Sequence, residues 1–219
     1  LFRSKVEGLT VDVQSTGASA ENLNLINKGE AEVALVQNDV MYYAYTATES
    51  FAGVDKNESF LTLGTVYPEV VQLVVAGDAG IETLADLKGK AVSIGDVGSG
   101  VESNAKQILA AAGIGLDEIT VRNLGFGESA NGIKDKTLDA AFVTAGTPTT
   151  AVTELAATND IKVLSLDQAV IDQLCADYGY YTEFVIPADV YGTDADAKTV
   201  AVKATIVVKA DLSEGLVYN

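Results

Sequence analysis

Small polar residues gather in four loops, each of which follows a strand-like apolar run and opens a helix-like run. The loops lie in STGASAEN (15–22), VQND (36–39), IGDVGSGVES (94–103) and TAGTPTT (144–150). They hold hydroxyl, amide and main-chain N–H groups, and no Lys or Arg. Such groups can bind an anion at a helix start, where N–H groups lack intrahelical partners and the helix dipole is positive. The loops therefore predict a site for a small anionic ligand.

The first of these loops carries no charge before Glu21, although the chain has a formal net charge of −17. We expect this neutrality because carboxylates in the loop would repel an anion. Each loop residue also has a simpler interpretation. Ser19 and Ser99 are typical helix caps, the latter with Glu102 three residues on, and Thr147 before Pro148 is a typical cap with proline at the first helical position. The two roles can coexist.

The chain lacks histidine altogether and holds one cysteine, Cys175. These counts exclude Ser-His-Asp and Cys-His catalysis, histidine-ligated metals and a structural zinc site. Gly95, Gly98 and Gly100 do not have the spacing of a dinucleotide-binding loop, and no Lys follows to form a phosphate loop. We expect no cofactor, no metal and no catalytic residue, and an acid–base enzyme built on Asp and Glu is the weakest of the alternatives.

Helix-like and strand-like segments alternate along all 219 residues, which is typical of an α/β fold with mainly parallel strands. The expected helices include 19–28, 101–112 and 148–157. The expected strands include Thr10–Gln14, Val33–Gln37, 60–67, 70–77 and 199–210. Parallel strands bring loops of this kind to one edge of a sheet, where open α/β proteins bind ligands. Residues 1–8 resemble the last turns of a helix, so we expect the intact protein to extend beyond both ends.

The balance of charge excludes some classes of binding partner. Lys and Arg number 14 against 31 Asp and Glu, so no basic surface for nucleic acid is expected. No apolar run is long enough to cross a membrane, and no signal peptide is present in these residues. The acidic excess and the avoidance of cysteine fit an exported protein.

With these loops identified, the chain resembles the TAXI family, the solute-binding proteins of TRAP transporters. The matching stretches include VQSTGASAENLNLINKGEAEVALVQNDVMYYAY, GTVYPEVVQLVV, LADLKGKAVSIGDVGSGVESNAKQILAAAG and FGESANGIKDKTLDAAFVTAGTPTTAV. Together with the stretches that follow them, they cover nearly the whole chain in the family's order.

The resemblance implies a two-lobed periplasmic-binding-protein fold of type II, in which each lobe is a mainly parallel sheet flanked by helices. The expected crossover strands are VVQLVV (70–75) and YYTEFVIP (180–187). Lobe 1 would combine 1–75 with 184–219, and lobe 2 would span 76–183. Family members begin with a further strand and a ligand-binding loop, which are missing from these residues.

The resemblance further implies a periplasmic or surface-exposed receptor, with a possible lipid anchor upstream, that captures a small carboxylate and hands it to a TRAP membrane permease. Glutamate, glutamine and 2-oxoglutarate are the ligand kinds it implies. A ligand-sensing module of a receptor with the same fold is the alternative. Glu69 is either a charge on the rim or an acceptor for a ligand amine. The expected ligand-binding residues are Thr16, Ser19, Asn22, Gln37, Asp39, Tyr67, Glu69, Gly98, Ser99, Gly100, Gly146, Thr147 and Thr149.

Overall fold

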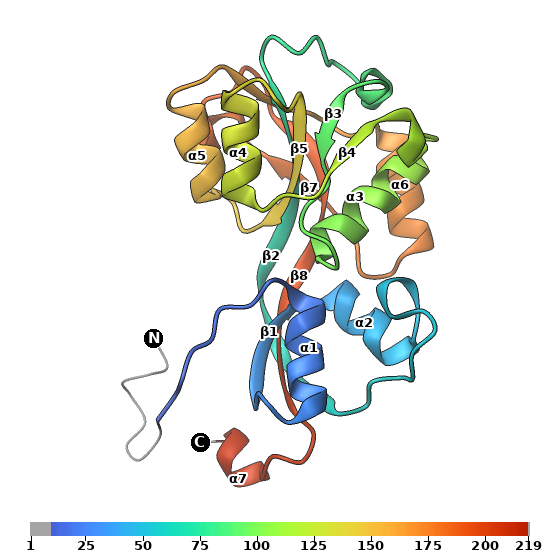
Figure 1. Ribbon diagram of the computed structural model, residues 1–219, viewed down its shortest axis with the longest axis vertical. Helices are drawn as coiled ribbons and strands as arrows, with labels where there is room; N and C mark the ends of the chain where they lie inside the picture. Colours follow the sequence, from blue (N-terminus) through green and yellow to red (C-terminus); the bar gives the residue numbers. More distant parts are fainter. Residues whose placement is uncertain (1–9, 219) are drawn as a thin grey trace.

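The computed structural model describes residues 10–218 and has the expected two-lobed α/β fold. Figure 1 shows one group of elements above another, joined by two long strands. The helices are α1 (Ser19–Lys28), α2 (Asn38–Thr46), α3 (Gly100–Ala111), α4 (Phe126–Lys134), α5 (Thr150–Ala156), α6 (Gln168–Asp177) and α7 (Glu214–Tyr218). The strands are β1 (Val33–Gln37), β2 (Phe60–Ala76), β3 (Ala91–Ser93), β4 (Thr120–Arg122), β5 (Ala140–Ala145), β6 (Ile161–Val163), β7 (Thr182–Ile186) and β8 (Ala197–Lys209).

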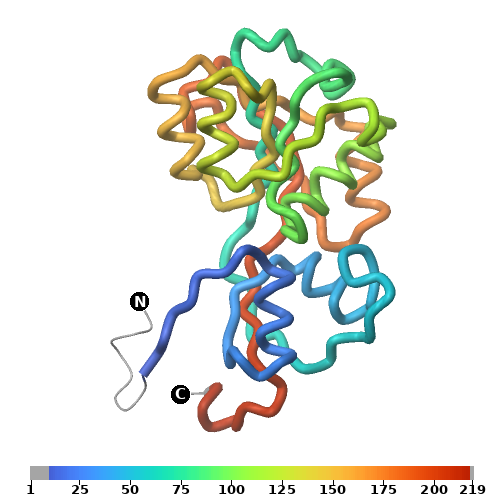
Figure 2. Tube along the Cα trace, viewed as in Figure 1, coloured from blue at the N-terminus to red at the C-terminus, as the bar shows by residue number. Residues whose placement is uncertain are grey.

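The two long strands are β2 and β8, which run antiparallel from Phe60 opposite Lys209 to Val70 opposite Ala201. The tube in Figure 2 follows both of them from the lower group into the upper one. The expected strands 60–67 and 70–77 are thus a single strand. Register shifts between Thr62 and Gly64 and between Thr65 and Tyr67 mark bulges, which twist and bend a strand without ending it.

The expected second crossover, 180–187, is wrong. Its strand β7 pairs only with the first part of β8, from Thr182 opposite Ala201 to Ile186 opposite Ala197. The strand that continues into the lower group is β8, because its later residues pair with β1 and with the start of β2. Residues 182–203 therefore pack with the upper group, whereas the sequence analysis placed 184–219 in lobe 1. The remaining limits of the lobes stay a prediction.

The sheet is mixed, in the order β1-β8-β2-β5-β3-β4, with β6 also paired to β2 and β7 to β8. The parallel pairs among the described strands are β3 with β4 and β3 with β5. The expectation of mainly parallel lobes fails because β2 and β8, which cross between the lobes, run antiparallel to every strand they contact.

The lower lobe is made of α1, α2, β1, the start of β2 and the end of β8. The upper lobe is made of the described elements from β3 to β7, together with the rest of β2 and β8. The upper lobe has a core on each face of its sheet. Val71, Leu73 and Val75 of β2 point toward one core, which α3 and α6 cover, and Val70 and Val74 point toward the other, which α4 and α5 cover. This alternation is the period of a strand that is buried on both faces.

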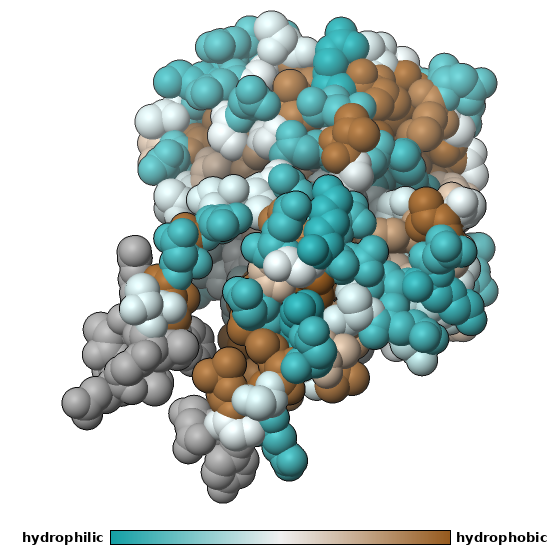
Figure 3. Space-filling model, turned by 60° about the horizontal axis from the view of Figure 1, so that its bottom comes forward, coloured by the Kyte–Doolittle hydropathy of each residue, from teal (hydrophilic) through white to brown (hydrophobic). Residues whose placement is uncertain are grey.

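Within residues 10–218, helices cover one face of the sheet of the lower lobe. Leu23 and Ile26 of α1 and Val40 of α2 pack on Val36 and Val207. On the opposite face, four apolar side chains are about half exposed: Val33, Leu35, Leu61 and Leu63. Figure 3 shows hydrophobic residues at this end of the molecule.

Thr10–Gln14 is not a strand, since the first strand of the sheet is β1. Alternation of period two shows only that a segment can lie on a sheet, whereas a strand also requires a ladder to its neighbour. The expected helix end at 1–8 lies outside the described residues. No helix within residues 10–218 is long and apolar enough to cross a membrane.

A candidate ligand-binding cleft between the lobes

A cleft of about 460 Å³ opens where the two lobes face each other. Both lobes and the crossing strand β2 contribute to its wall. Of the residues expected to bind the ligand, the wall contains Ser19, Gln37, Tyr67, Glu69, Ser99, Gly100 and Gly146. Its other members were not among the expected residues: Gly17, Ala18, Asp96, Val101, Phe126, Thr144 and Ala145.

The lower lobe presents the first turn of α1 to the cleft through Gly17, Ala18 and Ser19. Ser19 is not the cap of this helix, as the sequence analysis considered, because the capping position is Ala18. Its hydroxyl instead accepts a hydrogen bond of 3.1 Å from the main-chain N–H of Gln37. Ser19 thereby ties the start of α1 to the end of β1, so that two of the four polar loops lie side by side.

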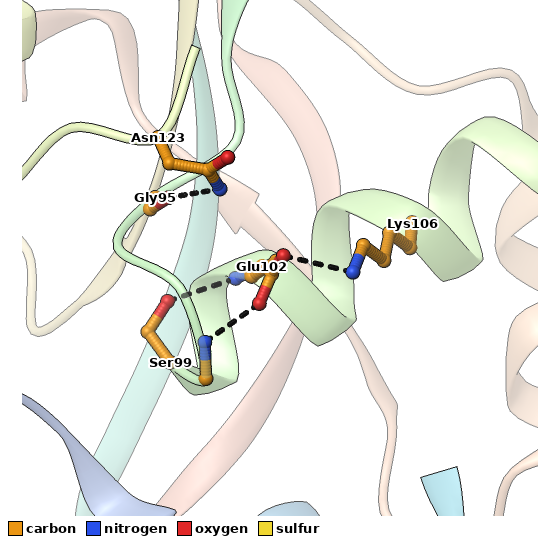
Figure 4. Close-up of polar contacts among 6 residues, drawn as sticks. Gly95, Ser99, Glu102, Lys106 and Asn123 are labelled. Atoms are coloured by element: carbon orange, nitrogen blue, oxygen red, sulfur yellow. Dashed lines mark hydrogen bonds and ion pairs between the residues drawn. The ribbon is translucent and has the colours of Figure 1, made fainter. Parts of the chain in front are cut away.

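The upper lobe presents the first turn of α3. Figure 4 shows that Ser99 caps this helix, as expected, with its hydroxyl accepting from the N–H of Glu102 at 3.1 Å. The Glu102 carboxylate accepts from the N–H of Gly98 at 2.7 Å and forms an ion pair with Lys106 at 2.8 Å. The Gly98 N–H is thus hydrogen-bonded within the loop. Gly98 is not among the residues of the cleft wall. Gly95 has a φ of +89°, which favours glycine, and its carbonyl accepts from Asn123 at 2.9 Å.

Gln37 lies against the start of α3. A Cβ on Gly100 would fall well inside the side-chain amide of Gln37, so only glycine fits at this position in the present arrangement of the lobes. The Gln37 amide donates to Asn104 Oδ1 at 3.1 Å, one turn further along α3. Gln37 of the lower lobe and Gly100 of the upper lobe are therefore in direct contact.

Asn104 is fully buried and uses both ends of its amide. Its oxygen accepts from Gln37 and also from the Thr144 hydroxyl at 3.1 Å. Its nitrogen donates to Asp39 Oδ2 at 2.7 Å and to the Tyr181 hydroxyl at 2.8 Å. Because Gln37 and Thr144 line the cleft, Asn104 orients side chains on both sides of it from behind the wall. Asn104 was not among the expected residues, because the sequence shows it only as a polar residue within a helix.

Asp39 lies behind the cleft wall and is completely buried. Burial raises the pKa of its carboxyl to about 6, although the hydrogen bond from Asn104 acts in the opposite direction. Its second oxygen, Oδ1, is the buried side-chain polar atom that has no hydrogen-bond partner among the described residues. Asp39 is therefore not brought to the ligand cleft directly, but it adds a negative charge close to it.

Tyr67 and Glu69 flank the proline at the crossing point of β2, where Pro68 is paired with Lys203. Burial raises the pKa of Glu69 to about 7, and the charge of Asp39 adds to this effect. Burial also raises the pKa of Tyr67, with a further contribution from Glu69. The cleft wall thus carries a carboxyl group whose ionisation is costly in the absence of a ligand.

Three further predicted residues, Thr16, Asn22 and Thr149, form hydrogen bonds away from the cleft wall. The Thr16 hydroxyl donates to Asn22 at 2.5 Å, and Asn22 donates to the Leu35 carbonyl at 2.8 Å. Thr149 accepts from Gln72 at 2.9 Å, and its main-chain N–H donates to the Tyr191 hydroxyl at 2.7 Å. Thr147 is not among the wall residues, and α5 begins at Thr150 after a Thr149 cap rather than at Pro148. The expected start of that helix was therefore wrong.

The residues that were missed had different signals. Asp96 and Thr144 stand in two of the polar loops and could have been found by taking every polar residue of those loops. Phe126 opens α4 and reaches the wall only through the packing of the upper lobe. Nothing in the local sequence marks it.

Comparison with known proteins agrees with this architecture. A family model described as the NMT1-like family matches residues 3–219. The alkanesulfonate-binding protein SsuA from Xanthomonas axonopodis pv. citri is 16% identical, with a TM-score of 0.57, over 92% of this chain and 55% of that one. The periplasmic aliphatic sulphonate binding protein SsuA from Escherichia coli is 17% identical, with a TM-score of 0.53, over 85% and 52%.

A third similar structure is the substrate-binding protein of an amino acid ABC transporter from Streptococcus pneumoniae, bound to L-arginine. It is 15% identical, with a TM-score of 0.54, over 96% of this chain and 67% of that one. The present chain spans about half the length of the two SsuA proteins. At these identities the likeness concerns the fold.

Proposed function

The chain belongs to the NMT1-like family, and from this membership and the cleft we propose that it is a solute-binding protein that captures a small carboxylate. It closes on the ligand by a hinge motion and delivers it to a membrane permease on the extracytoplasmic side. Its role is to bind and release, without chemical change of the ligand.

The observation that carries this proposal is the pair of helix starts that face one cleft. The first turns of α1 and α3 lie in opposite lobes, and both contribute to the wall, through Ala18 and Ser19 and through Ser99 and Gly100. The first N–H groups of a helix have no intrahelical partner, and the dipole there is positive. A carboxylate between the two turns would be bound by both lobes, which favours the closed state.

Two finer features of the proposal come from the resemblance to the TAXI family. The ligand kinds are glutamate, glutamine and 2-oxoglutarate, and the permease is of the TRAP class. Two of the similar structures hold MOPS and L-arginine according to their descriptions, and both ligands carry an acidic group. This supports an acidic ligand but does not separate the two classes of permease.

The proposal is tested by native mass spectrometry of the full-length protein, purified without refolding, and by thermal unfolding with the three ligand kinds. A ligand at about 100 times its Kd adds about 2.7 kcal/mol to the free energy of unfolding and raises Tm accordingly. If a wide panel of amino, keto and dicarboxylic acids leaves Tm unchanged, the protein is not a carboxylate receptor.

A charge placed at one helix start makes the test specific to the cleft. Asp caps helices as well as Ser does, so Ser99→Asp keeps the start of α3 while adding a negative charge to the wall. We expect ligand affinity to fall at least tenfold with little change in the Tm of the free protein. The matched control is Ser213→Asp, the same change at the start of α7, where the Ser213 hydroxyl accepts from Leu216 N. Equal effects of the two substitutions would contradict the proposed site.

A further inference from the structure

Apart from Tyr67, the cleft wall has two ionisable side chains, and both are acidic. They are Glu69, on the crossing strand, and Asp96, in the loop between β3 and α3. No Lys or Arg belongs to the wall. This differs from the neutral surface that the first loop led us to expect, and it adds negative charge to a site that has two helix starts for an anion.

Neither carboxylate has a partner within the described part of the chain. The ion pairs found there join other residues, and Glu69 and Asp96 take part in none of them and in no side-chain hydrogen bond. The nearby Glu102 behaves differently, because it accepts from Gly98 and pairs with Lys106. Two carboxylates in one cleft thus keep their full capacity to accept hydrogen bonds from a ligand.

A third carboxylate lies behind them. Asp39 is completely buried, its Oδ1 has no partner among the described residues, and its charge acts on Glu69. Asp39 is buried and Glu69 is half-buried, so holding their like charges close together without a cation is unfavourable, and a positive group in the cleft would relieve it. Among the described residues no group of three or more His, Cys, Asp or Glu side chains could hold a metal ion, which favours an organic cation.

We propose that Glu69 and Asp96 recognise an ammonium group of the ligand, so that the cleft selects amino acids over keto acids and dicarboxylates of the same size. This rests on the proposed function, since the carboxylate of the same ligand lies at the starts of α1 and α3. An ammonium donates charge-assisted hydrogen bonds to carboxylates, whereas a keto oxygen can only accept and is repelled by them.

The test compares L-glutamate with 2-oxoglutarate, which differ in the ammonium and keto groups, by isothermal titration calorimetry on the full-length protein. L-glutamine and glutarate complete the set. We expect L-glutamate and L-glutamine to bind at least about tenfold more tightly than 2-oxoglutarate and glutarate, which corresponds to about 1.4 kcal/mol. In Glu69→Gln and Asp96→Asn, affinity for the amino acids should fall while affinity for 2-oxoglutarate stays equal or rises.

The ratio of the two affinities separates recognition from structure. A substitution that only disturbs the fold lowers both affinities together, whereas loss of ammonium recognition changes their ratio. Glu154→Gln is the matched control, because Glu154 is exposed on α5 and outside the wall. We expect it to leave both affinities as they are.

The outcomes also distinguish this inference from the proposed function. If 2-oxoglutarate or glutarate binds as tightly as the amino acids, or if Glu69→Gln and Asp96→Asn leave the ratio unchanged, the inference is wrong and the carboxylate receptor stands. If none of the four acids binds, and no other carboxylate does, the proposed function fails first. Tight binding of a diamine that has no carboxylate would overturn the anion site and retain the role of Glu69 and Asp96.

Discussion

Gln37 and Gly100 touch across the cleft so closely that a Cβ on Gly100 would lie 1.9 Å from the Gln37 Oε1 and 2.3 Å from its Cδ. Gln37 ends β1 in the lower lobe, and Gly100 begins α3 in the upper lobe. Glycine at this position permits the close approach of a backbone, and it needs no unusual φ to do so. The approach of the lobes therefore depends on the absence of one side chain.

We expect Gly100→Ala to weaken ligand binding by tenfold or more. The added methyl group displaces Gln37, breaks its hydrogen bond to Asn104 and hinders the close approach of the lobes. The cost of such overpacking is about 1–3 kcal/mol. Calorimetric titration of the bound acid measures the effect.

Gly127→Ala is the control for this prediction. Gly127 lies in the first turn of α4, and a Cβ there meets nothing within 4 Å. Alanine should be neutral or stabilise the helix by up to about 1 kcal/mol. Equal ligand affinity in the wild type and in Gly100→Ala would mean that the contact of Gln37 with α3 has no part in binding.

We expect Asn104→Ala to reduce the free energy of unfolding by about 2–4 kcal/mol, because it leaves several buried groups without their partner. Those groups are the Gln37 amide, the Thr144 hydroxyl, the Tyr181 hydroxyl and the Asp39 carboxylate. Urea unfolding measures the change. Asn131→Ala, at an exposed position of α4, should stay within about 0.5 kcal/mol of the wild type. A loss in Asn104→Ala no larger than that would show that the network is not coupled to stability.

The stability of the ligand-free protein should fall as the pH rises from about 4 to about 7. In the folded protein burial raises the pKa of Asp39 from 3.8 to about 6 and that of Glu69 from 4.5 to about 7. Over this window the folded state binds more protons than the unfolded state. The contribution of these groups to the free energy of unfolding is therefore present at low pH and is lost as the carboxyls ionise. Urea unfolding at a series of pH values measures the slope.

Glu69→Gln should flatten this dependence in the upper part of the window, since it removes the group that titrates near neutral pH. Glu154→Gln should keep the slope of the wild type. An ammonium ligand should reduce the slope in the wild type, because it stabilises the ionised carboxylate. Stability that rises through the same window would contradict the assignment of these two groups.

Thr149→Ala and Tyr191→Phe should affect stability rather than binding. The Tyr191 hydroxyl donates to Gln72 at 2.5 Å and accepts from Thr149 N at 2.7 Å, behind the cleft. Its removal should cost about 1–3 kcal/mol in unfolding free energy and leave ligand affinity within about twofold. A large loss of affinity in Thr149→Ala would restore Thr149 to the ligand site, where the sequence analysis placed it.

Local pattern was sufficient for much of the fold. The helix 19–28 and its left-handed Gly29 follow from apolar periodicity and a glycine stop, and Ser99 with Glu102 correctly marks the start of α3. Pattern failed where pairing decides the outcome. The expected strand Thr10–Gln14 and the second crossover at 180–187 both have strand-like sequences, but a sequence does not state which neighbour a segment pairs with.

The sequence by itself determined that the protein is α/β, acidic and free of histidine, because these properties depend on composition and on short-range periodicity. It also indicated the loops that supply the cleft wall. Only the tertiary structure decided which polar residues of those loops face the cleft. Thr16, Asn22, Asp39 and Thr149 form hydrogen bonds elsewhere, while Asp96 and Thr144 line the cleft.

The physical reason is that a polar side chain bonds to whichever partner the packing brings near it. Asn104 shows this most clearly, since its partners come from residues about 40 to 77 positions away in the chain. No local pattern encodes such a set. Likewise, the close approach of Gln37 to Gly100, and the presence of two unpaired carboxylates in one cleft, exist only once the two lobes have come together.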